Sequence, residues 1–152
     1  MEPGSALRNP ADYLIHDHFH LKDLFAEYER LVPGEREKKS AVVREIDEEL
    51  RLHVRIEEQL LYPSLLSLKS RAVEELVRTA RSEHHALLTA ARDLLEASED
   101  LQDRMVKDLF KQIELYAGFE EKRLLPWSRA LPGVTLREMA LEIEEMKGER
   151  PH

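Results

Sequence analysis

Four long stretches of this chain repeat apolar residues every three or four positions, which is the spacing of one face of an α-helix. Short breaks follow three of them, at Pro33-Gly34, Lys69-Ser70 and Ser98-Glu99-Asp100. Antiparallel neighbours are the rule when helices are joined by such short turns, so the pattern predicts an all-α fold, an up-down-up-down four-helix bundle. The expected helices cover about 10–32, from 35–40 to about 62, 71–97, and from the last break to about 125.

The ends of the helices carry their own signals. Asn9-Pro10 suits a helix start, with asparagine as the N-cap and proline in the first turn. A residue before proline disfavours the α conformation, so we expect the second helix to end near Tyr62. Thr135 and Glu138 have the spacing of a capping box, which predicts a short fifth helix. The expected organisation is a disordered N-terminus (1–8), the bundle (9–131), and a C-terminal helix and tail (132–152).

Composition narrows the function classes. The 152 residues suffice for one domain with a sizeable core. The net charge of -8 gives no electrostatic reason to expect nucleic acid or an anionic membrane as a partner. The chain has no cysteine, which excludes disulfides, thiolate metal sites and cysteine catalysis. No apolar run has the length of a membrane span and no signal-peptide pattern is present, so we expect a cytoplasmic protein.

One segment occurs twice. Residues 53–63 and 116–126 lie at a constant offset of 63 positions, and both contain Glu-Glu-x-x-Leu-x-Pro in the same register. Positions i and i+4 share a helix face. His53 and Glu57 therefore point the same way from one helix, and Tyr116 and Glu120 point the same way from another.

Helical phase identifies two further inward histidines. His18 shares its face with apolar residues, whereas His20 lies on a charged face; His84 is likewise inward, and its neighbour His85 is not. Two residues that lie level with each other in an antiparallel helical hairpin have residue numbers whose mean falls at the turn. Applied to the three turns, this relation places the inward polar residues at one height. The predicted layer consists of His18, His53, Glu57, His84, Tyr116 and Glu120.

This layer favours a metal site over a satisfied polar core. A lone histidine on an apolar face is more often a hydrogen-bonded core residue, and Glu58 and Glu121 are expected to be solvated. Three histidines, two glutamates and a tyrosine at one height are harder to satisfy, because each unpaired buried charge costs on the order of several kcal/mol. Imidazole and carboxylate are ordinary ligands of first-row metals.

The pattern resembles the hemerythrin-like, or HHE cation-binding, domain family over about residues 10–130. The resemblance implies a non-haem di-iron centre with an oxo or hydroxo bridge. It implies Glu57 and Glu120 as bridging ligands, with His18, His53, His84 and residue 116 as terminal ligands. The competing ferritin-like pattern places glutamate before histidine at a spacing of three. The residues that carry the resemblance are Asp17-His18, His53, Glu57, Leu61-Tyr62-Pro63, Glu83-His84, Glu120 and Leu125-Pro126.

Tyr116 departs from the family pattern, which has histidine at that position. A phenolate ligand would favour Fe(III) over Fe(II), as tyrosine does in catalase. Alternatively, Tyr116 stays neutral and hydrogen-bonds to a bridging carboxylate. We favour ligation, and both possibilities stay open at this stage.

The ligand set indicates redox chemistry on a small oxidant. Reversible oxygen carriage needs a stable diferrous state, which a phenolate opposes, so hydrogen peroxide disproportionation ranks first and handling of NO or O2 next. The rivals are an iron- or redox-sensing or oxygen-binding module without turnover and, less favoured, a purely structural bundle. We expect a small-molecule partner and a monomer or weak homodimer.

Overall fold

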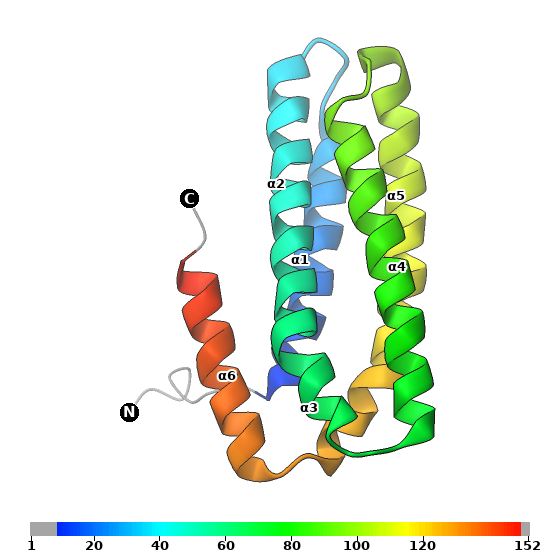
Figure 1. Ribbon diagram of the computed structural model, residues 1–152. Coiled ribbons are helices and arrows are strands. Elements are labelled where there is room, and N and C mark those ends of the chain that lie inside the picture. Colours follow the sequence, from blue (N-terminus) through cyan, green and yellow to red (C-terminus); the bar gives the residue numbers. More distant parts are fainter. Residues whose placement is uncertain (1–8, 150–152) are drawn as a thin grey trace.

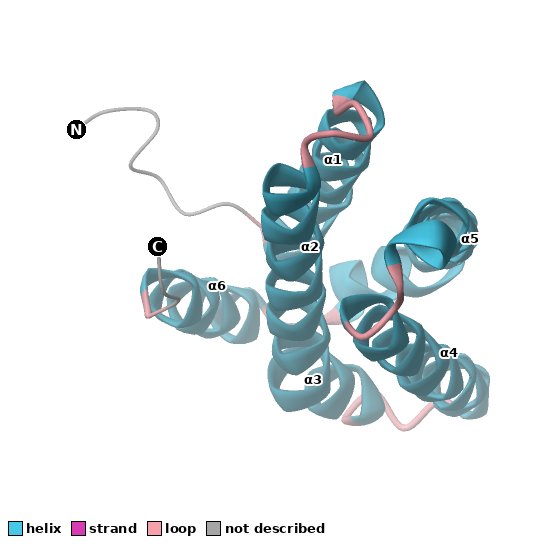
Figure 2. Ribbon diagram, turned by 90° about the horizontal axis from the view of Figure 1, so that it is seen from above, coloured by secondary structure: helices cyan, strands magenta, loops and turns pink. Residues whose placement is uncertain are grey.

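Four long helices form an up-and-down bundle in the computed structural model, which describes residues 9–149. Figure 1 shows them side by side, and Figure 2 shows the same helices from above. The predicted fold class is confirmed, and the described residues contain no strand. None of the helices within residues 9–149 has both the length and the apolar character of a membrane span. The bundle helices are α1 (Pro10–Arg30), α2 (Arg36–Ile56), α4 (Arg71–Leu95) and α5 (Glu99–Phe119).

The caps and the core follow the sequence pattern. Asn9 Oδ1 accepts a hydrogen bond from the Ala11 amide at 3.0 Å, as expected of an N-cap. The apolar stripes meet along the bundle axis, where fully buried side chains come from every helix. Burial of each such aliphatic side chain stabilises the fold by about 1.5–3 kcal/mol. Representatives are Leu14 of α1, Ile46 of α2, Leu87 of α4 and Leu109 of α5.

Pro63 predicts that the second helix ends near Tyr62, but in the structure the helical path continues beyond it. A π-helical turn (Glu57–Leu61) follows α2, and α3 (Tyr62–Leu66) continues the helical path. The Tyr62 amide donates to the Glu57 carbonyl, five residues earlier. Proline has no N–H and cannot form the regular bond to the carbonyl four residues before it. The wider turn directly before Pro63 lets the chain stay helical.

The second copy of the repeat has the same local structure. A second π-helical turn (Glu120–Leu124) follows α5, and a 3-10 helix (Leu125–Ala130) continues beyond the expected end near Leu125. Here the Leu125 amide donates to the Glu120 carbonyl. Both π turns therefore begin at a glutamate and precede a proline.

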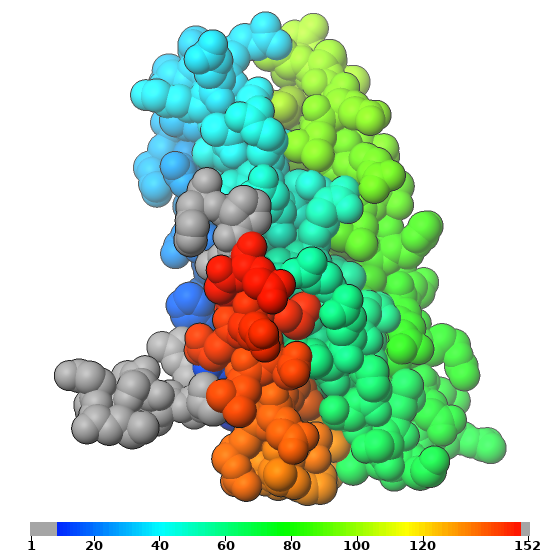
Figure 3. Space-filling model, turned by 60° about the vertical axis from the view of Figure 1, so that its left-hand side comes forward, coloured from blue at the N-terminus to red at the C-terminus, as the bar shows by residue number. Residues whose placement is uncertain are grey.

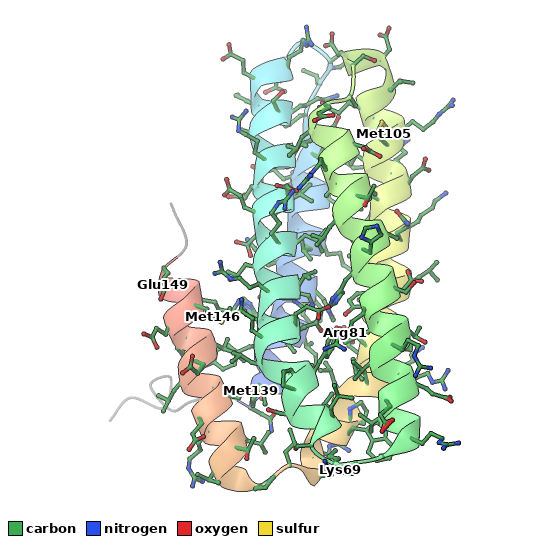
Figure 4. The ribbon with its side chains drawn as sticks, viewed as in Figure 1. Lys69, Arg81, Met105, Met139, Met146 and Glu149 are labelled. Carbon is green, nitrogen blue, oxygen red and sulfur yellow. The ribbon has the colours of Figure 1, made fainter. Side chains whose placement is uncertain are left out.

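The fifth helix, α6 (Gly133–Gly148), lies outside the bundle, along its lower half in Figure 1. The predicted capping box is wrong: the helix starts after Pro132 without a side-chain cap, which leaves Thr135 inside the first turn. The helix packs against α1, α2 and the first π turn, and its surface is continuous with theirs in Figure 3. Met139, Ile143 and Met146 bury one face of it, and Figure 4 shows both labelled methionines on the side facing α2.

Candidate metal centre

All six residues predicted for the polar layer lie buried at one level of the bundle. The most exposed of them, His18, shows only 8 % of its surface, and both glutamates show none. His18 comes from α1 and His53 from α2, and each glutamate is the first residue of a π turn. His84 and Tyr116 come from α4 and α5. The helical-phase prediction of which side chains point inward is therefore confirmed.

The first cluster of donor atoms contains His18, His53 and Glu120, whose donor atoms all lie within 4.8 Å of one another. His18 Nε2 is 2.9 Å and His53 Nε2 is 3.3 Å from the same oxygen, Oε1 of Glu120. His53 Nε2 is also 3.3 Å from Oε1 of Glu57. Two imidazoles thus converge on one carboxylate oxygen.

The second cluster contains Glu57, His84 and Glu120, at the same mutual spacing. His84 Nε2 lies 2.8 Å from Oε1 of Glu57. The Tyr116 hydroxyl lies 2.8 Å from that same oxygen and 2.5 Å from Oε2 of Glu120. Glu120 belongs to both clusters: its Oε1 faces His18 and His53, and its Oε2 accepts a hydrogen bond from the Tyr116 hydroxyl. A carboxylate shared in this way is suited to bridge two cations.

A carboxylate binds the outer nitrogen of each histidine. His53 Nδ1 donates to Asp17 at 2.9 Å, His84 Nδ1 to Glu58 at 2.8 Å, and His18 Nδ1 to Glu121 at 2.6 Å. Such a partner holds the proton on Nδ1 and leaves Nε2 as the free lone pair. All three lone pairs are directed inward as a result.

The inner atoms of the layer fit a bound cation. In this tautomer, the histidine Nε2 atoms face carboxylate oxygens, so that acceptor meets acceptor at 2.8–3.3 Å. A buried acceptor without a donor is costly. Five buried side-chain atoms of the described residues have no hydrogen-bond partner, and four of them belong to this layer: His18 Nε2, His53 Nε2, Glu57 Oε2 and Glu120 Oε1. Imidazole nitrogen and carboxylate oxygen together suit iron and other first-row metals.

Without a metal, protons on the histidines would have to offset the negative charge of the buried glutamates. Burial alone lowers the pKa of His53 and raises that of Glu57, but their mutual attraction outweighs it. The Glu57 and Asp17 carboxylates raise the pKa of His53 to about 10, while His53 and His84 lower the pKa of Glu57 to about 2. Burial raises the pKa of Asp17 too, yet the hydrogen bond from His53 and the charge of Lys147 bring it below its ordinary value. Without a bound cation, a protonated His53 therefore supplies the positive charge beside the Glu57 carboxylate, where a metal would otherwise supply it.

Two tyrosines close the layer on the side of α4. The Tyr62 hydroxyl lies 2.9 Å from His84 Nε2 and 3.1 Å from the Tyr116 hydroxyl, which itself lies 2.7 Å from His84 Nε2. Burial and the negative charge of Glu57 raise the pKa of Tyr116 well above its ordinary value. In the metal-free chain Tyr116 is therefore a neutral phenol that donates its proton to a glutamate.

Histidines expected outside the layer do lie outside it. His85 is exposed, and His20 reaches only the periphery, 3.7 Å from Glu49. Glu58 and Glu121 are partly solvent-exposed, as expected, but each also hydrogen-bonds a site histidine, which was not expected. The Glu-Glu doublet, present in both copies of the repeat, was the sequence signal for them. The contribution of Lys147, from α6, had no such signal.

Buried histidines and glutamates that converge from four helices define a class of metal-binding helical bundles. The model of the hemerythrin HHE cation binding domain matches residues 9–128, and the chain belongs to that family. Domains of this family bind metal ions, typically iron. A hemerythrin HHE cation-binding domain-containing protein from Mycobacterium kansasii has a similar fold, with a TM-score of 0.77 and 23% sequence identity. The match covers 93% of this chain and 89% of that one. No curated protein sequence matches the chain.

Proposed function

We propose that this chain is a non-haem di-iron protein whose centre reacts with a small oxidant, hydrogen peroxide first and NO or O2 next. The observation that carries the proposal is the pair of donor clusters that share Glu120. The proposed ligands are those of the polar layer. One ion would be held by His18, His53 and Glu120, and the other by His84, Tyr116, Glu57 and Glu120.

Hydrogen peroxide is favoured because its disproportionation is self-contained. Two H2O2 give O2 and two H2O: one molecule loses two electrons and the other gains them, so no external reductant is required. Bound iron would supply the redox chemistry, because it can take up and release these electrons. Tyr116, as a hard oxygen donor, would stabilise the ferric state and so oppose plain oxygen carriage.

The residues of the chain have three tasks in this proposal. Burial of the layer keeps bulk water away from the reacting atoms. The Tyr62 hydroxyl, which is not a proposed ligand, lies 3.1 Å from the Tyr116 oxygen and could deliver or accept a proton beside the bound ions. A cleft of about 210 Å³ between α1 and α5 exposes the edge of His18, which gives small solutes a place to approach.

The proposal is tested by iron loading followed by oxygen evolution from peroxide. Protein expressed with iron should hold two iron atoms per chain and release one O2 for every two H2O2 consumed. The matched control is His85→Ala, which alters an exposed histidine beside His84. An iron-loaded protein that consumes no peroxide would contradict the proposed reaction while leaving the metal site intact.

A sensor without turnover is the second candidate, and one observation favours it. Lys147 of α6 contacts Asp17, which holds His53, so the state of the centre is connected to a peripheral helix. Hydrogen exchange along α6 would then differ between iron-loaded and iron-free protein. Absence of peroxide turnover together with such a difference would favour the sensor over the enzyme.

A further inference from the structure

The C-terminal helix contributes a charge to the metal layer from outside the family-matched residues 9–128. Lys147 Nζ donates to Oδ1 of Asp17 at 2.5 Å. The Asp17 side chain is only 6 % exposed, and that of Lys147 is 19 % exposed. Met146, the residue before Lys147, is buried against the bundle and fixes the end of the helix there. The ammonium is therefore held in place rather than free in solvent.

Asp17 connects this ammonium to His53. Its two oxygens have separate partners: Oδ1 accepts from Lys147 and Oδ2 accepts from His53 Nδ1 at 2.9 Å. The carboxylate that orients the imidazole thus divides its negative charge between two donors. A change at Lys147 alters how strongly Asp17 attracts the His53 proton.

The other two histidines lack a cation that is as well shielded from water as Lys147. Glu58, behind His84, is paired with Arg81 at 3.1 Å, but these side chains are 33 % and 47 % exposed. Figure 4 shows Arg81 beside the lower part of α4. Within the described residues, no lysine or arginine lies within 4 Å of Glu121, which holds His18. Charges interact more strongly where water is excluded. Lys147 therefore affects His53 through Asp17 more strongly than Arg81 affects His84 through Glu58.

We propose that Lys147 is a positioning residue that sets the donor strength of His53, and with it the reduction potential of the bound iron. This inference rests on the proposed function. A carboxylate that accepts a proton more strongly makes its histidine a better donor to the metal. Lys147 weakens that pull on His53, and its positive charge also opposes the added charge of the ferric state. Both effects raise the reduction potential.

The rival explanation is that Lys147 only docks α6. Lys147→Met retains the aliphatic contact and removes the charge; Tyr13→Phe removes the hydroxyl that donates to Glu144 of the same helix and leaves the charges unchanged. Loss of docking would affect both variants alike. Lys38→Met is the control for net charge, because Lys38 is 72 % exposed and pairs with Glu35 far from the layer.

The experiment is a redox titration of the iron-loaded variants, with iron content measured first. Lys147→Met should lower the reduction potential, Lys147→Arg should restore it, and Asp17→Asn should shift it in the opposite direction. Tyr13→Phe and Lys38→Met should match the wild type. Equal potentials in the wild type and Lys147→Met, or an equal shift in Tyr13→Phe, would overturn this inference alone. A wild type that holds no iron would overturn the proposed function and this inference with it.

Discussion

Glu57 and Glu120 are related by more than the repeat: each is fully buried, and each is the first residue of a π-helical turn. Single π turns occur frequently at functional sites. Here both turns lie between an inward residue of the preceding helix and a proline. This places the two carboxylates face to face across the bundle, where His53 Nε2 lies 3.3 Å from an oxygen of each.

The first prediction concerns the shared carboxylate. Glu120→Ala removes an oxygen donor from both clusters, so this variant should lose most of both irons. Glu57→Ala should also lose most of its iron, because Glu57 faces both His53 and His84. Metal analysis of purified protein checks both results. Full loading of Glu120→Ala would show that it does not bridge.

The second prediction separates the histidines by position. His18→Ala and His84→Ala each remove an inward nitrogen and should weaken iron binding, measured by competition with a chelator. His20→Ala and His85→Ala alter residues at the periphery and should bind iron like the wild type. Iron loss in His85→Ala with retention in His84→Ala would contradict the described orientation of α4.

Sequence periodicity was sufficient for the bundle and for the inward side chains, because both depend on which face of a helix is apolar. His84 and His85 were separated on this basis alone. Sequence periodicity does not predict the two π turns. A proline signals a disrupted helix, but whether the helix ends there or widens into a π turn depends on what the surrounding helices bury. The prolines therefore predict helix ends near Tyr62 and Leu125, whereas the helical path continues at both places.

Contacts made from outside the apolar stripe were also missed. Lys147 is separated from Asp17 by 130 residues, and periodicity does not disclose which charge on α6 faces the bundle. Glu121 remains partly exposed while it binds His18, so its position on the helix is that expected of a solvated residue. Thr135 and Glu138 had capping-box spacing, yet Pro132 starts the helix earlier.

The third prediction is that metal contributes to stability. A ligand that binds only the folded state adds about 3–4 kcal/mol at a hundred to a thousand times its dissociation constant. For a chain of this size that corresponds to a melting temperature higher by about 10 °C. Calorimetry before and after chelation measures the difference. Equal melting temperatures would mean that protons and water already satisfy the layer.

The fourth prediction concerns the pH dependence of stability. It involves Asp103, at the opposite end of the bundle from the metal centre. Asp103 accepts hydrogen bonds from Tyr28 at 2.6 Å and from Lys39 at 3.1 Å, and these lower its pKa. A carboxyl with a lowered folded-state pKa stabilises the protein above its unfolded value and loses that effect as the pH falls through the folded value. Asp103 is 59 % exposed, so the contribution is below about 1 kcal/mol.

Urea unfolding of Asp103→Asn tests this directly. The variant should be less stable than the wild type at neutral pH, and the gap should close below about pH 4. Asp108→Asn, another exposed position on α5, is the control and should show no such pattern. A gap that persists at low pH would point to lost packing instead of charge.

The fifth prediction addresses Tyr116. If its phenolate binds Fe(III), the oxidised protein has a visible charge-transfer band with tyrosine ring modes in resonance Raman spectra. Tyr116→Phe should abolish this band and retain most of the iron, because the three histidines and both glutamates remain. Identical spectra in the two proteins would mean that Tyr116 only hydrogen-bonds to Glu57 and Glu120, and would remove the main argument against oxygen carriage.

The central claim is that two iron ions share Glu120 inside the bundle. Its most direct test is an anomalous difference map at the iron edge, from crystals of iron-loaded protein. The account predicts two peaks: one bounded by His18, His53 and Glu120, and one bounded by His84, Glu57 and Glu120. A single peak, or no peak between these side chains, would contradict it.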